Sequence, residues 1–205
     1  MSEWHLTDDD LHRAEWFRWD ASVAADRPDL AEAVAAFDAF SERNPSAAQH
    51  VTEWFVAHAQ VQKACVTRIM VSEGRVAAFY SLSSAEMSIG ATQNLTEMGV
   101  FRAPGPPDSF RVGSSHVEFI ARDRRSPPGT GKFALRRAFG VATITAGMQG
   151  NLALTLDPAD HATEAMWRAQ GFRNTERTLT GGLRRLYHPI FGPAYGPLAA
   201  LRPNS

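Results

Sequence analysis

A glycine-rich turn between a strand pattern and a helix pattern holds the residues with the clearest chemical potential. The segment, residues 116–139, reads HVEFIARDRRSPPGTGKFALRRAF. Gly129 and Gly131 have no side chains, so backbone N–H groups at the helix start can approach an anion closely, and the helix dipole adds attraction. The turn therefore predicts a cradle for a phosphate or pyrophosphate group.

Two ionisable residues, His116 and Glu118, lie on the strand that leads into this turn. Residues 115–122 alternate, with one face made of Val117, Phe119 and Ala121 and the other of His116, Glu118 and Ile120. A buried Glu118 carboxylate could act as a general base that accepts a proton from a substrate, with His116 as a proton relay. A structural ion pair of Glu118 with Arg122 or Arg124 is the alternative.

Basic residues flank the turn on both sides. Arg124 and Arg125 could contact phosphates, and Lys132, Arg136 and Arg137 make the following helix start basic. A solvated helix face explains Arg136 and Arg137 equally well.

The letters PPGTGK also resemble the Walker A loop of P-loop ATPases, with residues 152–157 in place of a Walker B strand. A Walker A loop needs Gly where this chain has Ser126, and Ser or Thr where it has Phe133. The magnesium-binding hydroxyl is missing, so nucleotide hydrolysis is the weaker hypothesis.

Patterns in the first half predict helices at residues 8–19 and 29–41, and a firmer one with Asn44 as its cap and Pro45 at its first position. Residues 65–71 and 75–83 predict a hairpin around a turn at Gly74. Residues 90–113 are expected to form a long surface loop, because they carry four Gly and three Pro.

The second half predicts a helix at 130–146, a strand at 152–156, a helix at 161–170 and strands at 172–177 and 183–188. Asp157 and Asp160 could meet a substrate ammonium, but DPAD also reads as a helix start with Asp at the cap, and we favour the cap.

Composition limits the partners. Twenty-one Lys and Arg balance 22 Asp and Glu, so any RNA contact must be a local patch. The single cysteine, Cys65, excludes an internal disulfide, and no Cys and His spacing matches a zinc site. The chain is therefore expected to be cytoplasmic and metal-free. The acidic N-terminus and the absence of an apolar run near ~20 residues predict neither secretion nor a membrane span.

The order of these segments resembles the GNAT superfamily of N-acetyltransferases. Its acyl-CoA loop reads Gln or Arg, two residues, Gly, one residue, then Gly or Ala, at a strand-to-helix junction, and Gly129-Thr130-Gly131 matches its end. Ser126 replaces the Gln or Arg, with Arg125 one place early. Residues 152–172, LALTLDPADHATEAMWRAQGF, resemble the strand and the helix ending in Gly-Phe that follow in the superfamily.

The resemblance covers about residues 65–188 and implies an α/β fold with a mixed, splayed central sheet flanked by helices. Extra helices in residues 1–64 and a Pro/Gly-rich tail at 189–205 complete a single domain. The implied reaction is direct transfer of an acetyl group from acetyl-CoA, the cosubstrate, to a primary amine. The residues implied to contact the coenzyme are Ile120, Ala121, Arg122, Arg125, Ser126, Gly129, Thr130, Gly131, Lys132, Phe133 and Trp167.

A closer resemblance is to the acetyltransferase toxins of toxin–antitoxin pairs. It lies in His58-Ala59, Glu73-Gly74-Arg75-Val76 and Tyr80-Ser81-Leu82. Those toxins acetylate the amine of aminoacyl-tRNA and are silenced by ribbon-helix-helix antitoxins. The resemblance therefore implies a charged tRNA as one candidate acceptor and an antitoxin-like protein as a candidate partner, alongside a homodimer.

One position departs from the superfamily. Its usual general acid is a Tyr four residues before the Gly of Gly-Phe, and this chain has Trp167 there. An indole cannot usefully protonate a thiolate. Either the thiolate leaves unassisted or through water, or another phenol such as Tyr80 substitutes, or the protein binds acyl-CoA without fast turnover.

Overall fold

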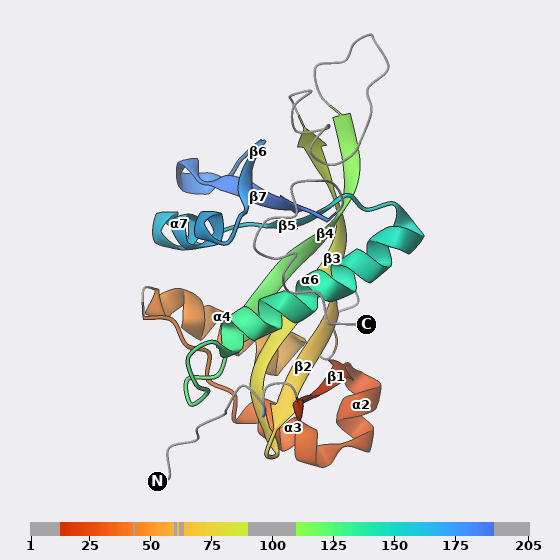
Figure 1. The fold of residues 1–205 in the computed structure, drawn as a ribbon. Helices are drawn as coiled ribbons and strands as arrows, with labels where there is room; N and C mark the ends of the chain where they lie inside the picture. The colour runs from red at the N-terminus through yellow and green to blue at the C-terminus, as the bar shows by residue number, and fades with distance from the viewer. Residues whose placement is uncertain (1–12, 43, 60, 62–63, 90–109, 191–205) are drawn as a thin grey trace. The chain divides into compact units, whose positions relative to one another are not determined.

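The computed structural model describes residues 13–42, 44–59, 61, 64–89 and 110–190 (Figure 1). In these residues the strands are hydrogen-bonded in the order β1-β2-β3-β4-β5-β7-β6. Their bounds are β1 Glu15–Trp19, β2 Val66–Ser72, β3 Arg75–Ile89, β4 Phe110–Arg122, β5 Ala153–Leu156, β6 Arg173–Thr178 and β7 Arg184–Pro189. The helices are α2 Ala21–Asp26, α3 Pro28–Ala35, α4 Pro45–His58, α6 Thr130–Gln149, α7 His161–Ala169 and the short η1 Thr180–Gly182.

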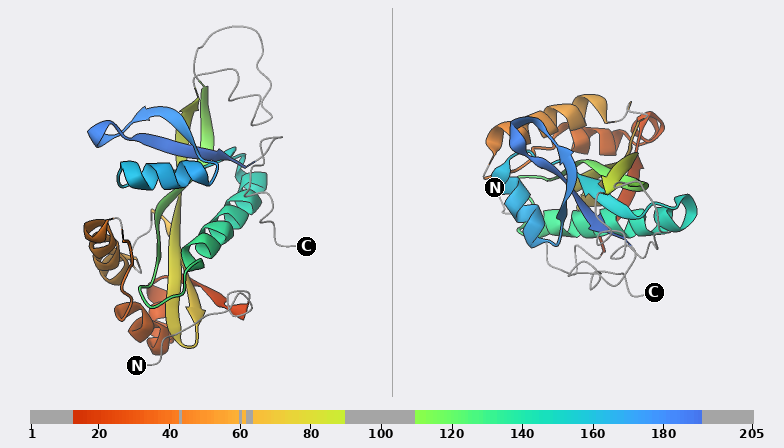
Figure 2. Two further views of the ribbon diagram at one scale, coloured as in Figure 1. Left: turned by 60° about the vertical axis from the view of Figure 1, so that its left-hand side comes forward. Right: turned by 90° about the horizontal axis from the view of Figure 1, so that it is seen from above.

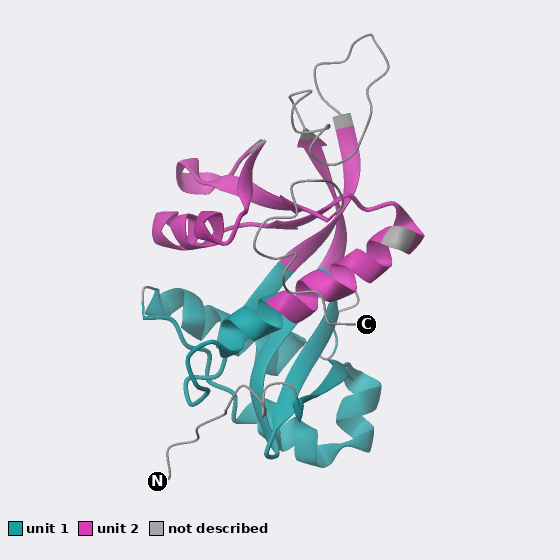
Figure 3. Cartoon of the chain, in the orientation of Figure 1, with its two compact units in different colours: residues 1–82, 118–135 teal, residues 83–117, 136–205 magenta. Residues whose placement is uncertain are grey.

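The chain divides into two compact units, which Figure 3 colours separately. Unit 1 comprises residues 1–82 and 118–135, and unit 2 comprises residues 83–117 and 136–205. The long elements β3, β4 and α6 each contribute residues to both units.

In unit 1 both faces of the strands are covered. One face packs against α3 and α4 through a core that includes Leu30, Phe55 and Phe79. The other face packs against the start of α6 through Met70, Ala78 and Ala134. Figure 2 (left) shows α4 and the start of α6 on opposite sides of β2 and β3.

The expected helix at residues 8–19 is wrong at residues 15–19. Residues 15–19 form β1, which pairs antiparallel with β2 from Glu15↔Val71 to Trp19↔Thr67. Trp16 packs with one core, whereas Phe17 and Trp19 pack with the other. Successive aromatic side chains thus pack on opposite faces of the sheet. A strand places neighbouring side chains on opposite faces, whereas a helix does not.

The expected helix at 29–41 is shorter than predicted, because α3 ends at Ala35. The following backbone pairs with the end of β4 instead. The N–H of Phe40 donates to the carbonyl of Arg122 at 3.1 Å, and the N–H of Arg124 donates to that of Asp38 at 2.7 Å. The next helix, α4, begins as predicted, with the Asn44 side chain accepting from the Ala47 N–H at 2.9 Å.

The predicted hairpin is confirmed as β2 and β3, joined by Glu73 and Gly74 with φ of 51° and 72°. Two consecutive positive φ values are typical of a tight hairpin turn. Both strands that flank the expected loop are longer than predicted, since β3 extends to Ile89 and β4 begins at Phe110. The rest of that expected loop, and the tail from residue 191, lie outside the described residues.

Unit 2 contains the elements expected after the glycine turn, each within a few residues of its predicted bounds. Strand β5 pairs parallel with β4 and antiparallel with β7, and β7 pairs antiparallel with β6. The predicted α/β fold with a mixed sheet is therefore confirmed.

The Walker A hypothesis is wrong, because a P-loop domain needs a predominantly parallel sheet and this sheet is mostly antiparallel.

Candidate functional site

A buried carboxylate, Asp123, organises the backbone where β4 ends. Its side chain is 0% exposed and accepts from the backbone N–H groups of Asp38 at 3.0 Å and Arg125 at 2.8 Å. The Arg125 guanidinium adds two more hydrogen bonds, at 2.7 and 2.8 Å, which raise the pKa of Arg125 above its ordinary value. Full burial of a carboxylate is tolerated only with such compensation.

Ser126 and Arg122 hold the next part of the turn. The Ser126 hydroxyl is buried and donates to the carbonyl of Ala77 on β3 at 2.7 Å. Arg122 Nη1 donates to the carbonyl of Ser126 at 2.7 Å, and its guanidinium lies 4.3 Å from the centre of the Phe40 ring. Ser126, Arg122 and Arg125, all expected at the coenzyme, therefore shape the turn through contacts of their own.

The glycine turn itself leaves backbone accessible. Gly129 has φ of 98°, and its carbonyl accepts the Phe133 N–H at 3.0 Å. Thr130 is buried and its hydroxyl donates to the carbonyl of Pro127 at 2.8 Å. A Cβ added at Gly131 would meet no heavy atom within 4 Å. The N–H groups of Gly131 and Lys132 lie in the first turn of α6, where a helix has no acceptors of its own.

The end of strand β4 offers a second stretch of backbone that could contact a coenzyme. Its parallel register with β5 runs from Ser114↔Ala153 to Val117↔Leu156, where β5 ends, and β4 continues to Arg122. The side chains of Ile120 and Ala121 pack against the two cores of unit 1. Contacts of these two residues with a coenzyme would therefore come from their backbone. Phe133 is likewise a packing residue, stacked 6.5 Å from Trp16.

Glu118, the expected general base, is exposed rather than buried. The expectation of burial is wrong because the Glu118 side chain is on the face of β4 opposite to Phe119, whose ring packs against the core that contains Phe55 and Phe79. Its negative charge helps to raise the pKa of the Cys65 thiol, although burial of that thiol is the larger cause. A role of Glu118 as general base would therefore depend on its position beside the coenzyme strand, and not on burial of its carboxylate. The two arginines considered as its ion-pair partners have other contacts, Arg124 with Asp38 and Arg122 with Ser126.

His116 belongs to a buried polar row in unit 2. The residue is 5% exposed, and its Nδ1 lies 2.9 Å from the Thr155 hydroxyl. Its Nε2 lies 4.0 Å from Asp157, which receives two hydrogen bonds of 2.6 Å from Arg185. Burial by itself would raise the pKa of Asp157, but Arg185, then His116 and Arg177, outweigh it and hold that pKa below 3.8.

The two aspartates of DPAD have separate roles. Asp160 caps α7, accepting from the Thr163 N–H at 2.6 Å, so the cap interpretation is confirmed for this residue. Asp157 takes no part in the cap and instead pairs with Arg185.

Trp167 is half-buried on α7 and meets the Phe172 ring edge-to-face, with centroids 5.6 Å apart. The chain turns back at Gly171, which has φ of 92°, and the Phe172 N–H donates to the Trp167 carbonyl at 3.2 Å. Tyr80, the phenol considered as a substitute, and a second phenol, Tyr187, are both buried. Tyr80 is 0% exposed beside Trp16, and Tyr187 is 1% exposed, with burial raising its pKa.

Within the described part of the chain, no group of three or more His, Cys, Asp or Glu side chains could hold a metal ion. None of the helices described has both the length and the apolar character that crossing a membrane requires.

No family model matches the chain, and no curated protein matches it by sequence. Solved structures do. A bacterial toxin superposes with a TM-score of 0.61 at 13% identity, over 86% of this chain and 90% of that chain. AtaT complexed with acetyl-methionyl-tRNAfMet gives 0.56 at 14% identity, over 76% and 86%. AtaTR bound with acetyl-CoA gives 0.57 at 15% identity, over 86% and 93%. The chain therefore has the fold of these toxin structures.

Proposed function

We propose that this chain is an acetyl-CoA-dependent N-acetyltransferase whose acceptor is the amine of an aminoacyl-tRNA. The observation that carries the proposal is the open glycine turn at the β4–α6 junction, held from inside by Asp123. Backbone N–H groups of Gly131 and Lys132, the positive end of α6 and the exposed Lys132 side chain suit a pyrophosphate.

The acceptor class is supported by one of the structural neighbours. AtaT is complexed with acetyl-methionyl-tRNAfMet, an aminoacyl-tRNA that carries an acetyl group. AtaTR is bound with acetyl-CoA. The two ligands are the product and the donor of the reaction that we propose for this chain.

The reaction needs a neutral amine and a stabilised leaving group. The amine nitrogen attacks the thioester carbonyl carbon, a C–N bond forms, the C–S bond breaks, and the amine proton leaves. Glu118 is our candidate for accepting that proton directly, since its carboxylate is exposed beside the coenzyme strand. His116 is the candidate relay, because Thr155 and Asp157 orient its ring.

A second candidate function is an acyl-CoA-binding module with impaired turnover. Trp167 favours it, because an indole stands where the superfamily carries a phenol, and because Tyr80 and Tyr187 are both buried. Either function leaves room for a protein partner, since AtaT is also solved bound to the C-terminus of the antitoxin AtaR. We propose an antitoxin-like partner on this basis, and a cytoplasmic location.

The test starts with binding and ends with product. We expect acetyl-CoA to bind in the micromolar range and to raise the melting temperature more than ATP with magnesium does. Incubation of charged tRNA with labelled acetyl-CoA should then yield N-acetyl-aminoacyl-tRNA, detected by mass spectrometry of the released amino acid. Binding without label transfer or thiol release would favour the impaired module. A larger shift with ATP would refute both.

A further inference from the structure

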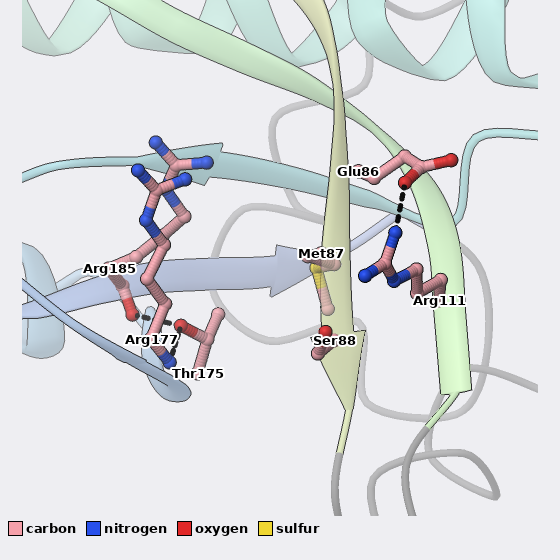
Figure 4. A pocket seen from close by; sticks show the side chains of 7 residues that line it. All are labelled: Glu86, Met87, Ser88, Arg111, Thr175, Arg177 and Arg185. Carbon is pink, nitrogen blue, oxygen red and sulfur yellow. Dashed lines mark hydrogen bonds and ion pairs between the residues drawn. The ribbon is translucent and has the colours of Figure 1, made fainter.

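A pocket of about 440 Å³ opens in unit 2 between residues of the strands β3, β4, β6 and β7. Its volume falls within the range of ligand-binding pockets. Three of its seven lining residues are arginines, as Figure 4 shows: the wall consists of Glu86, Met87, Ser88, Arg111, Thr175, Arg177 and Arg185.

Two of these arginines share one carboxylate. Arg185 makes a bidentate pair with Asp157, and its side chain is 9% exposed. Arg177 also acts electrostatically on Asp157, helping to lower the pKa of that carboxyl. No carboxylate of the described residues lies within ion-pair distance of the exposed Arg177 guanidinium. Among the described side chains of this wall, the two guanidinium groups thus face the single carboxylate of Asp157, which leaves an excess of positive charge there.

The opposite wall carries a loosely held cation. Arg111 lies 3.6 Å from Glu86, and the two side chains are 80% and 69% exposed. Exposed pairs of this kind contribute little, so the Arg111 guanidinium can turn to another anion at small cost. Figure 4 shows Arg111 across β3 from Arg177 and Arg185.

Thr175 fixes the backbone that presents these groups. Its hydroxyl donates to the Arg185 carbonyl at 3.0 Å and accepts the Arg177 N–H at 3.1 Å. Arg185 is held by Asp157 as well. The backbone that carries Arg177 and Arg185 is thus held in place before a ligand binds. Less conformational entropy is then lost on binding.

We propose that this pocket binds the phosphate backbone of the RNA acceptor, an inference that rests on the proposed function. Guanidinium groups pair with phosphate oxygens in a bidentate manner, and a polynucleotide can place successive phosphates against both walls. The chain as a whole has a net charge of −1, so it attracts RNA only through a local cluster of this kind.

The experiment measures tRNA affinity of the full chain by fluorescence anisotropy over a series of salt concentrations. R177Q should weaken tRNA binding by about 10-fold and reduce the slope of log K against log salt by about one. The control is R184Q, which removes an equal charge from the exposed Arg184 on the same hairpin, outside the pocket lining. It should change affinity less than two-fold. Acetyl-CoA affinity should be unchanged in both.

Each other outcome has a definite meaning. If R177Q and R184Q lose tRNA affinity equally, the assignment of the pocket is overturned, because the loss would then follow from the change in net charge alone. Acetylation of aminoacyl-tRNA by R177Q at the wild-type rate also overturns the pocket and leaves the proposed function standing. If inorganic phosphate binds at Arg177, seen by side-chain Nε NMR, and tRNA does not compete, the ligand is free phosphate and the RNA assignment is overturned. Failure of acetyl transfer to every amine, with tRNA binding still dependent on Arg177, would refute the proposed function alone.

Discussion

Asp123 and Arg125 form a bidentate ion pair at the end of β4, with Arg125 Nε and Nη2 lying 2.7 and 2.8 Å from the two carboxylate oxygens. Arg125 Nη2 also donates to the Ala36 carbonyl at 2.6 Å. The pair therefore joins residues 36–38 to residues 123–125, where the glycine turn begins. An arginine that resembles a coenzyme ligand in the sequence serves here to hold the turn.

Replacing Arg125 with Met should destabilise the protein by about 2 kcal/mol, because it leaves the Asp123 carboxylate buried without its partner. The value lies below the usual range for a broken buried pair, since the Arg125 side chain is 43% exposed and water screens it. Urea unfolding measures the difference. R124M is the matched control, because the Arg124–Asp38 pair is exposed on both sides and its loss should change stability little.

Gly131→Val should abolish acetyl-CoA binding while leaving the protein folded. The open space above Gly131 accommodates the valine side chain, which would then occupy the approach of the pyrophosphate. Calorimetry measures the affinity, and Gly140→Val, at another unobstructed glycine of α6, controls for the loss of helix propensity. Unchanged affinity in a folded Gly131→Val protein would move the coenzyme site elsewhere.

Glu118→Gln should lower the turnover rate by roughly 10²-fold with acetyl-CoA affinity intact, if Glu118 accepts the amine proton. Raising the pH should restore part of the rate, because a larger fraction of the amine is then already neutral. Initial rates of thiol release between pH 6 and 9 test this. The exposed Glu53, on α4, provides the control variant E53Q. Wild-type turnover in Glu118→Gln would make Glu118 a structural residue.

Trp167→Tyr should raise turnover, since general acid assistance is typically worth ~10²- to 10⁴-fold. The gain should be smaller than this range, because a smaller ring leaves a void against Phe172 and can misplace the hydroxyl. Trp167→Phe separates the two effects, as it makes the same void without a hydroxyl. If both variants are slower than the wild type at every pH, Trp167 shapes the acyl pocket and supplies no missing acid function.

Stability should fall as the pH drops below about 6.5 because of His188. Burial lowers the pKa of this imidazole below its ordinary value of 6.5, and the contact of Nδ1 with the Pro189 carbonyl at 2.8 Å only partly opposes the shift. The unfolded chain therefore binds the proton first, so the stability present above pH 6.5 is lost as the pH falls through the lower folded pKa.

His188→Phe keeps an aromatic ring between Phe139 and Phe172 and should flatten this pH dependence. Urea unfolding at each pH measures it. Replacing His58, which is exposed on α4, with Gln should leave the slope unchanged. An unaltered slope in His188→Phe would assign the effect to another group.

The parts of the fold that were predicted correctly depend on local signals. Asn44 and Pro45 mark the start of α4, and Gly74 marks the hairpin turn. Neither signal depends on residues that are distant in the sequence. Strand β1 was mistaken for a helix because its conformation depends on pairing with β2, about 50 residues away in sequence. The early end of α3 has the same cause, since residues 38–40 pair with residues 122–124.

The same difference between local signals and long-range contacts applies to the candidate site. The glycine turn was recognisable because its residues are contiguous. The role of Asp123 was missed, since only tertiary packing decides that this carboxylate is buried, although its place between arginines in RDRR was a signal. The arginine pocket was missed because Arg111, Arg177 and Arg185 come from separate segments, and no spacing pattern joins them.

Strand β4 carries His116 and Glu118 two residues apart, followed by Ile120 to Arg122, without an interruption in its backbone, and the buried Asp123 comes directly after it. Because side chains alternate along a strand, inserting or deleting one residue here would turn every later side chain to the opposite face. Substitutions leave this phase unchanged. In a library of variants under selection for activity, β4 from residue 114 to residue 122 should therefore tolerate almost no change in length, even at positions that accept another side chain, whereas a length change between residues 179 and 183, in the turn that connects β6 to β7, should be tolerated.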